Sequence, residues 1–97
     1  MNSNAQKVYD YLMEGPKDFH MGNHKTCVLG AAKRAGCPSM LMNICTTYDA
    51  SAWLGLSLEQ TQMLCLDWED ENVTGPSAAR ERAGMLRAMC EANERGV

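Results

Sequence analysis

Apolar residues recur along most of this chain at spacings of three and four, which is the period of an α-helix with one buried face. In the first segment of this kind, Ser3 or Asn4 can cap a helix that Gly15-Pro16 then ends. The apolar face of this helix comprises Ala5, Val8, Tyr9 and Leu12. The pattern therefore predicts an amphipathic helix in the first fifteen residues.

A second helix is predicted after a loop over residues 17–23, which contains turn-forming residues and has no sustained apolar period. The helix starts near Asn23 or Thr26 and stops at Gly36, with Pro38 shortly beyond. It is rich in glycine and alanine, so a neighbouring helix can approach it closely. We expect it to be the central buried helix of the fold.

The middle of the chain carries one ambiguous segment and one clear helix start. Residues 39–48 contain a short apolar run that fits a helix or a strand, and the absence of strand patterns elsewhere favours a helix. Asp49 is predicted to cap a short turn that ends at Gly55. Ser57-Leu58-Glu59-Gln60 matches a capping box, and the helix that it opens is expected to extend to about residue 68.

The last helix begins at Gly75-Pro76, with proline at its first position, and ends before Gly96. Together these elements predict an all-α fold of four or five helices in a single domain over residues 1–97. A chain of 97 residues, 45% of them hydrophobic and 22% charged, is suited to one folded globular domain. The predicted core contains Val8, Leu12, Leu29, Ala32, Leu64, Leu86 and Cys90.

Charge and cysteine content exclude several classes of protein. The net charge of −3 divides into about +2 for residues 1–48 and −5 for residues 49–97, and neither half has the clustered basic residues of a nucleic-acid-binding domain. No apolar stretch is long enough to cross a membrane, and no signal peptide is evident, so we expect a cytoplasmic protein. Five cysteines, an odd number at irregular spacings, indicate reduced thiols.

Two kinds of chemistry centre on the start of the second helix. His20, His24, Cys27 and Cys37 are four potential zinc ligands, although their spacing is not that of a standard zinc finger. Alternatively, Cys27 could be a nucleophile with His24 or His20 as its base and Asp70 as the orienting group, but no glycine-rich oxyanion loop is present. The simpler interpretation, which we favour, is that Cys27 is a buried, unreactive thiol beside two exposed histidines.

Two charged segments offer binding sites of opposite sign. Lys17, His20, His24 and Lys25 precede a helix N-terminus, whose free amides suit an anion such as a nucleotide phosphate. Asp67, Glu69, Asp70 and Glu71 form an acidic run that does not fit a calcium loop and instead suits a basic protein partner. Among the eight methionines, Met21, Met40 and Met42 are the candidates for an exposed, adaptable contact surface.

Three short motifs resemble an uncharacterised family of small bacterial and phage helical proteins. They are Cys27-x-Leu29-Gly30-Ala31, Trp68-Glu69-Asp70 and Thr74 before the last helix, and they cover about residues 24–94. Members of the family typically have Trp-Asn-Asp, so Glu69 departs from the pattern. The resemblance implies a helical fold and supplies no activity.

The absence of a catalytic signature favours a small non-enzymatic interaction protein without a cofactor. It would bind or inhibit a protein partner and form a homo-oligomer, and a phage origin would agree with the resemblance. The first alternative is a binder of nucleotide-like anions that uses residues 17–27. The second is a small zinc-binding domain or a cysteine hydrolase.

Overall fold

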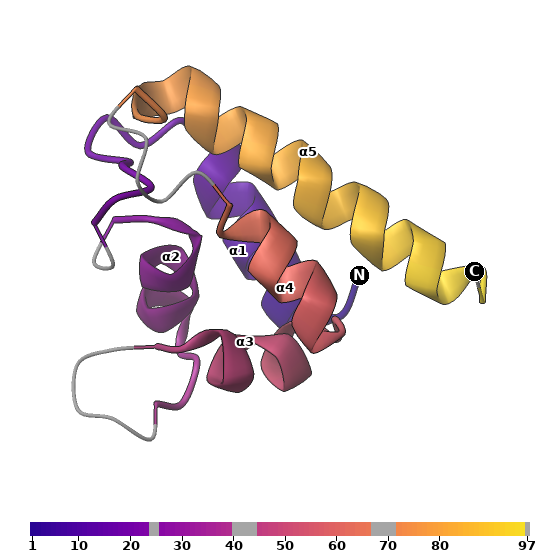
Figure 1. Ribbon diagram of the computed structural model, residues 1–97. Coiled ribbons are helices and arrows are strands. Elements are labelled where there is room, and N and C mark those ends of the chain that lie inside the picture. Colours follow the sequence, from indigo (N-terminus) through magenta and orange to yellow (C-terminus); the bar gives the residue numbers. More distant parts are fainter. Residues whose placement is uncertain (24–25, 40–44, 67–71, 97) are drawn as a thin grey trace.

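The computed structural model describes residues 1–23, 26–39, 45–66 and 72–96. Within them the chain forms five helices that pack into a single all-α domain (Figure 1). These are α1 (Ser3–Met13), α2 (Val28–Ala35), α3 (Thr47–Leu54), α4 (Leu58–Leu64) and α5 (Gly75–Glu94). The predicted all-α fold class is confirmed.

Helix α1 is the central element, because it packs against α5, α2 and α3. The prediction that the second helix would be central is wrong: α2 packs against α1 on one side and α3 on the other. The buried face of α1 contains Ala5, Val8 and Leu12, as its apolar spacing requires. Its N-cap is Asn2, one residue before the predicted positions, and the Asn2 side chain accepts a hydrogen bond from the amide of Ala5 at 2.7 Å.

Helices α2 and α3 both end at a glycine in the left-handed conformation. Gly36 has φ +110° and Gly55 has φ +76°, values that a residue with a side chain adopts only with strain. Helix α3 starts earlier than predicted, because Thr46 is its cap and Asp49 is the reciprocal partner in a capping box. Of the helix predicted over residues 39–48, residues 40–44 lie outside the described part of the chain, residues 39, 45 and 46 are not helical, and residues 47 and 48 belong to α3.

Helix α4 begins at the predicted capping box, in which Ser57 and Gln60 each bond to the backbone of the other. It ends at Leu64, earlier than predicted, and the carbonyl oxygen of Leu64 accepts a hydrogen bond from Arg82 at 3.2 Å. Arg82 belongs to α5 and is buried, so a cation lies at the negative end of the α4 dipole.

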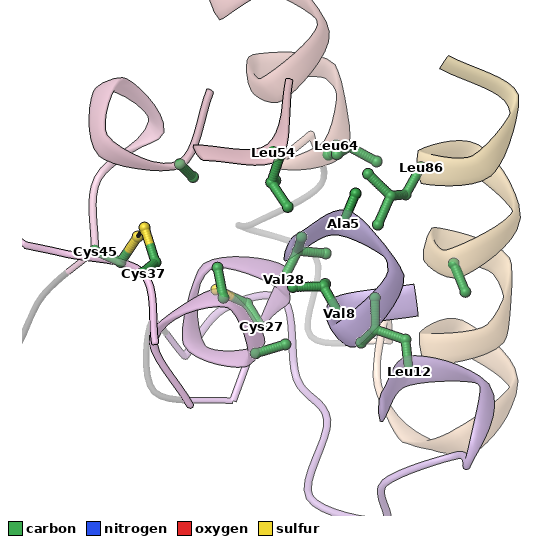
Figure 2. Packing of buried hydrophobic residues seen from close by; sticks show 14 of the residues in the cluster. Ala5, Val8, Leu12, Cys27, Val28, Cys37, Cys45, Leu54, Leu64 and Leu86 are labelled. Carbon is green, nitrogen blue, oxygen red and sulfur yellow. Dashed lines mark hydrogen bonds between the residues drawn. The ribbon is translucent and has the colours of Figure 1, made fainter. Parts of the chain in front are cut away.

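The core lies between α1 and the helices around it (Figure 2). Six of the seven predicted core residues are buried, and the exception is Leu29, which is only partly buried at its edge. The loop before α2 contributes Phe19 and Met21, which sequence periodicity did not indicate. Met21, one of the three candidates for an exposed contact surface, is buried, while Met40 and Met42 lie outside the described residues.

Candidate functional site

The loop over residues 17–23 is held against the start of α5. The carbonyl oxygen of Phe19 accepts hydrogen bonds from the hydroxyl of Thr74 at 2.6 Å and from the amide of Gly75 at 2.8 Å. The amide of Met21 donates to the carbonyl of Val73 at 3.0 Å. With the Phe19 ring fully buried, this loop is a fixed part of the fold.

The predicted anion site is only partly within the described residues. Lys17 is exposed, and His20 is partly buried, which corrects the expectation of an exposed histidine. The Nδ1 atom of His20 accepts a hydrogen bond from the amide of Gly22 at 2.9 Å, so this nitrogen is already occupied. His24 and Lys25 lie outside the described residues, and the anion site stays a prediction.

The predicted zinc ligands Cys27 and Cys37 are separated by a whole helix. Cys27 is the N-cap of α2, and Cys37 follows the glycine at its other end. A helix of this length spans about 12 Å, whereas two thiolates on one zinc lie within about 5 Å of each other. The two cysteines therefore lie at opposite ends of α2, and residues 1–23, 26–39, 45–66 and 72–96 contain no group of three potential metal ligands. Because His24 lies outside these residues, the zinc site stays a prediction.

Cys27 is buried, with 4% of its surface exposed, as predicted for a packing thiol. Its side chain makes no capping hydrogen bond to α2. Burial raises the pKa of the nearby Cys65 thiol, and the electrostatic effect of Cys27 raises it further, to about 12. Of the other members of the proposed triad, His24 and Asp70 lie outside the described residues, and the alternative base His20 accepts a hydrogen bond from Gly22 at Nδ1.

The structure brings together a different pair of cysteines, Cys37 and Cys45. The Cys45 thiol donates to the sulfur of Cys37 at 3.2 Å, and both residues are only 2% exposed (Figure 2). Burial raises the pKa of the Cys37 thiol, an effect that the hydrogen bond from Cys45 partly offsets. Burial and the same hydrogen bond raise the pKa of Cys45 to about 12.

Sequence reasoning missed this pair because it considered Cys37 only with the residues before it. A signal was nevertheless present. Cys37 directly follows the glycine that ends α2, and Cys45 directly precedes Thr46, the cap of α3. Cysteines that flank a short connection between two helices are candidates for close approach, because the connection returns the chain to the next helix.

An apolar surface lies where α4 runs antiparallel to α5. Met63, in the last turn of α4, is 52% exposed, and Leu66, two residues beyond the helix, is 55% exposed. The amide of Leu66 donates a hydrogen bond to the carbonyl oxygen of Met63 at 3.3 Å. The side of α5 that faces α4 is identified by two contacts, from Arg82 to Leu64 and from Asn93 to Gln60.

Met85 and Met89 lie on that same side of α5, since they are three and seven residues after Arg82. Both are half-buried against the core. Met63 is in turn three residues after Gln60, the α4 residue that bonds to Asn93. We call Met63, Leu66, Met85 and Met89 the α4–α5 surface.

A shallow pocket of about 300 Å³ lies where the end of α5 meets the start of α1 and the end of α3. Its polar groups are engaged with one another: Glu94 pairs with the amino group of Met1, and Asn93 donates to the carbonyl of Gly55 at 3.2 Å. Cys90 also lines the pocket, and burial raises the pKa of its thiol, which makes it a poor nucleophile at neutral pH.

Comparison with protein-family models, curated proteins and solved structures found no match. The resemblance to the family of small bacterial and phage helical proteins stays a prediction. In the part of the chain that the structure describes, no helix has the length and apolar character needed to cross a membrane.

Proposed function

We propose that this protein is a small non-enzymatic interaction module that binds another protein through the α4–α5 surface. The observation that carries the proposal is the exposure of Met63 and Leu66, two large apolar side chains at the end of α4, while Met85 and Met89 are half-buried on the side of α5 that faces α4. A group of apolar side chains on one face marks an interaction surface more often than scattered single residues do.

The composition of this surface favours a protein partner. Three of its four side chains are methionines, which are unbranched and polarizable and can adapt to partners of different shape. In the sequence, Leu66 is followed directly by the acidic run that contains Asp67, Glu69, Asp70 and Glu71. The expected partner therefore presents an apolar patch bordered by lysine or arginine.

A second copy of this chain is also a candidate partner, because residues 1–48 carry a net positive charge and residues 49–97 a net negative one. Self-association in which the α4–α5 surface of one copy meets residues 1–48 of another would depend on concentration and would weaken at high salt. Sedimentation velocity over a range of protein and salt concentrations measures it directly.

The test compares two double variants that change the same number of exposed apolar residues and add the same charge. Met63→Glu with Leu66→Glu alters the α4–α5 surface, and Met13→Glu with Tyr48→Glu alters exposed residues on α1 and α3. Each variant and the wild type are used for affinity capture from a lysate, with quantitative mass spectrometry of the retained proteins.

The proposal expects a partner that the wild type and the Met13/Tyr48 variant retain equally and that the Met63/Leu66 variant retains at least tenfold less. Direct titration with that purified partner must reproduce the loss. Equal retention by both variants would contradict the proposed surface.

The competing anion-binding function is tested with the same proteins. If inorganic phosphate or a nucleotide raises the Tm strongly, and if Lys17→Ala removes the increase while no protein is captured, then the ligand hypothesis replaces the interaction hypothesis.

A further inference from the structure

The Cys37–Cys45 contact links two helices that are consecutive in the chain. Cys37 lies just beyond the end of α2, where its amide bonds to the carbonyl of Ala32 at 3.0 Å. Cys45 lies just before Thr46, whose hydroxyl and amide bond to the Asp49 carboxylate within α3. The backbone of Cys37 is therefore held by the end of α2, and Cys45 directly precedes the capped start of α3. The two sulfurs lie 3.2 Å apart.

We propose that Cys37 and Cys45 are a redox pair that forms a reversible disulfide and thereby clamps the end of α2 to the start of α3. A disulfide requires the sulfurs to approach to about 2.05 Å, roughly 1 Å closer than in the dithiol form. Rotation about the side-chain bonds can supply a movement of this size. Among the described residues, Cys37 and Cys45 are the only two cysteines joined by a hydrogen bond between their sulfurs. Cys90, in contrast, lies on α5.

The oxidant is a low-molecular-weight disulfide of the glutathione type. The Cys37 thiolate attacks one sulfur of glutathione disulfide, which forms a mixed disulfide on Cys37 and releases one glutathione as a thiolate that takes up the Cys37 proton. The sulfur of Cys45 then loses its proton and attacks the Cys37 sulfur of the mixed disulfide. This step forms the Cys37–Cys45 bond and releases the second glutathione, so that two electrons and two protons pass to two glutathione thiols.

Cys37 is assigned the first attack because it accepts the hydrogen bond from Cys45, which stabilises negative charge on its sulfur. Cys45 then resolves the mixed disulfide. Since both thiols are buried, the first step is slow in the native protein and proceeds when this region opens locally. Once formed, the disulfide is shielded from external thiols for the same reason.

The experiment incubates the full chain with mixtures of reduced and oxidised glutathione, stops the exchange with acid, and maps disulfides by mass spectrometry. Trypsin alone does not separate the relevant cysteines, because no lysine or arginine lies between residues 35 and 79. Chymotrypsin is added to cleave after Tyr48 and so remove Cys65 from the fragment with Cys37 and Cys45.

We expect a Cys37–Cys45 disulfide that still forms when reduced glutathione is in excess, and a Tm several degrees higher in the oxidised protein than in the reduced protein. Cys45→Ser should accumulate a stable glutathione adduct on Cys37, because the resolving thiol is missing. The matched control Cys65→Ser should form the Cys37–Cys45 disulfide as the wild type does.

The proposal is overturned if the wild-type protein shows free Cys37 and Cys45 after glutathione disulfide has oxidised other cysteines of the chain. It is also overturned if Cys37 is linked to a cysteine other than Cys45. Both results come from the wild-type protein and do not depend on whether the variants fold.

Discussion

Thr74 donates its hydroxyl to the carbonyl oxygen of Phe19 at 2.6 Å, across 55 residues of sequence. Thr74 occupies the N-cap position of α5, where a threonine side chain ordinarily bonds to its own helix, yet it makes no capping bond there. Its hydroxyl instead holds the loop before α2 against the start of α5. This contact gives Thr74, one of the motif residues in the sequence, a structural role.

Replacement of Thr74 by valine should lower the free energy of unfolding by about 1 kcal/mol. The loss stays moderate because the carbonyl of Phe19 keeps its hydrogen bond from the amide of Gly75 at 2.8 Å. Urea unfolding monitored by circular dichroism measures the change, and Thr74→Ser is the control that keeps the hydroxyl. Wild-type stability in Thr74→Val would show that the hydroxyl contributes nothing.

The helices could be predicted from the sequence because their signals are local. The capping box at Ser57 and Gln60, the stop at Gly36 and the proline after Gly75 each act within a few residues. Some helix boundaries predicted from these local signals were nevertheless wrong by a few residues. At α3, both Thr46 and Asp49 can cap a helix, and only the structure shows that they act together in a longer one.

The candidate sites depend on contacts between helices, which periodicity does not specify. Arg82 would be placed in solvent by its charge, yet it is buried because it reaches the end of α4. Cys37 was grouped with Cys27 by sequence distance, but a helix separates them and the turn after it brings Cys37 to Cys45. Such pairings become visible only when the helices are placed in three dimensions.

Opposite outcomes are predicted for Leu64, the last residue of α4, and Leu66, which lies two residues later and outside the helix. Leu64 is fully buried and Leu66 is exposed. Leu64→Ala should cost about 2–5 kcal/mol of unfolding free energy, because it removes transfer energy and leaves a cavity. Leu66→Ala should change it by less than about 0.5 kcal/mol. Chemical denaturation compares the two variants, and similar losses of unfolding free energy would contradict the burial of Leu64 and the exposure of Leu66.

The five thiols should resist alkylation in the folded protein. Cys27, Cys37, Cys45 and Cys90 are buried, and Cys65 is partly buried with a pKa of about 12, so none is an exposed thiolate at neutral pH. Iodoacetamide labelling mapped by mass spectrometry should be slow in buffer and complete in denaturant. Rapid native labelling of Cys27 would restore the nucleophile hypothesis, and one equivalent of zinc in the purified protein would restore the metal site.

The raised pKa of Cys45 should make the protein less stable at alkaline pH. Its thiol ionises near pH 9 in the unfolded chain and near pH 12 in the folded one, so the unfolded state releases its proton first as the pH rises. Below pH 9 both states are protonated and the stabilisation is complete; between pH 9 and 12 it is progressively lost.

The thiol of Cys45 alone should account for about 1 kcal/mol of the stability lost between pH 8 and pH 10. Other groups also titrate in this range, so the measurement compares Cys45→Ala with the wild type, both kept reduced, by urea unfolding at each pH. The variant is expected to be less stable at pH 8 because a buried sulfur is removed, but its stability should fall less steeply as the pH rises. Parallel declines for the two proteins would show that Cys45 ionises in the folded state as readily as in the unfolded state.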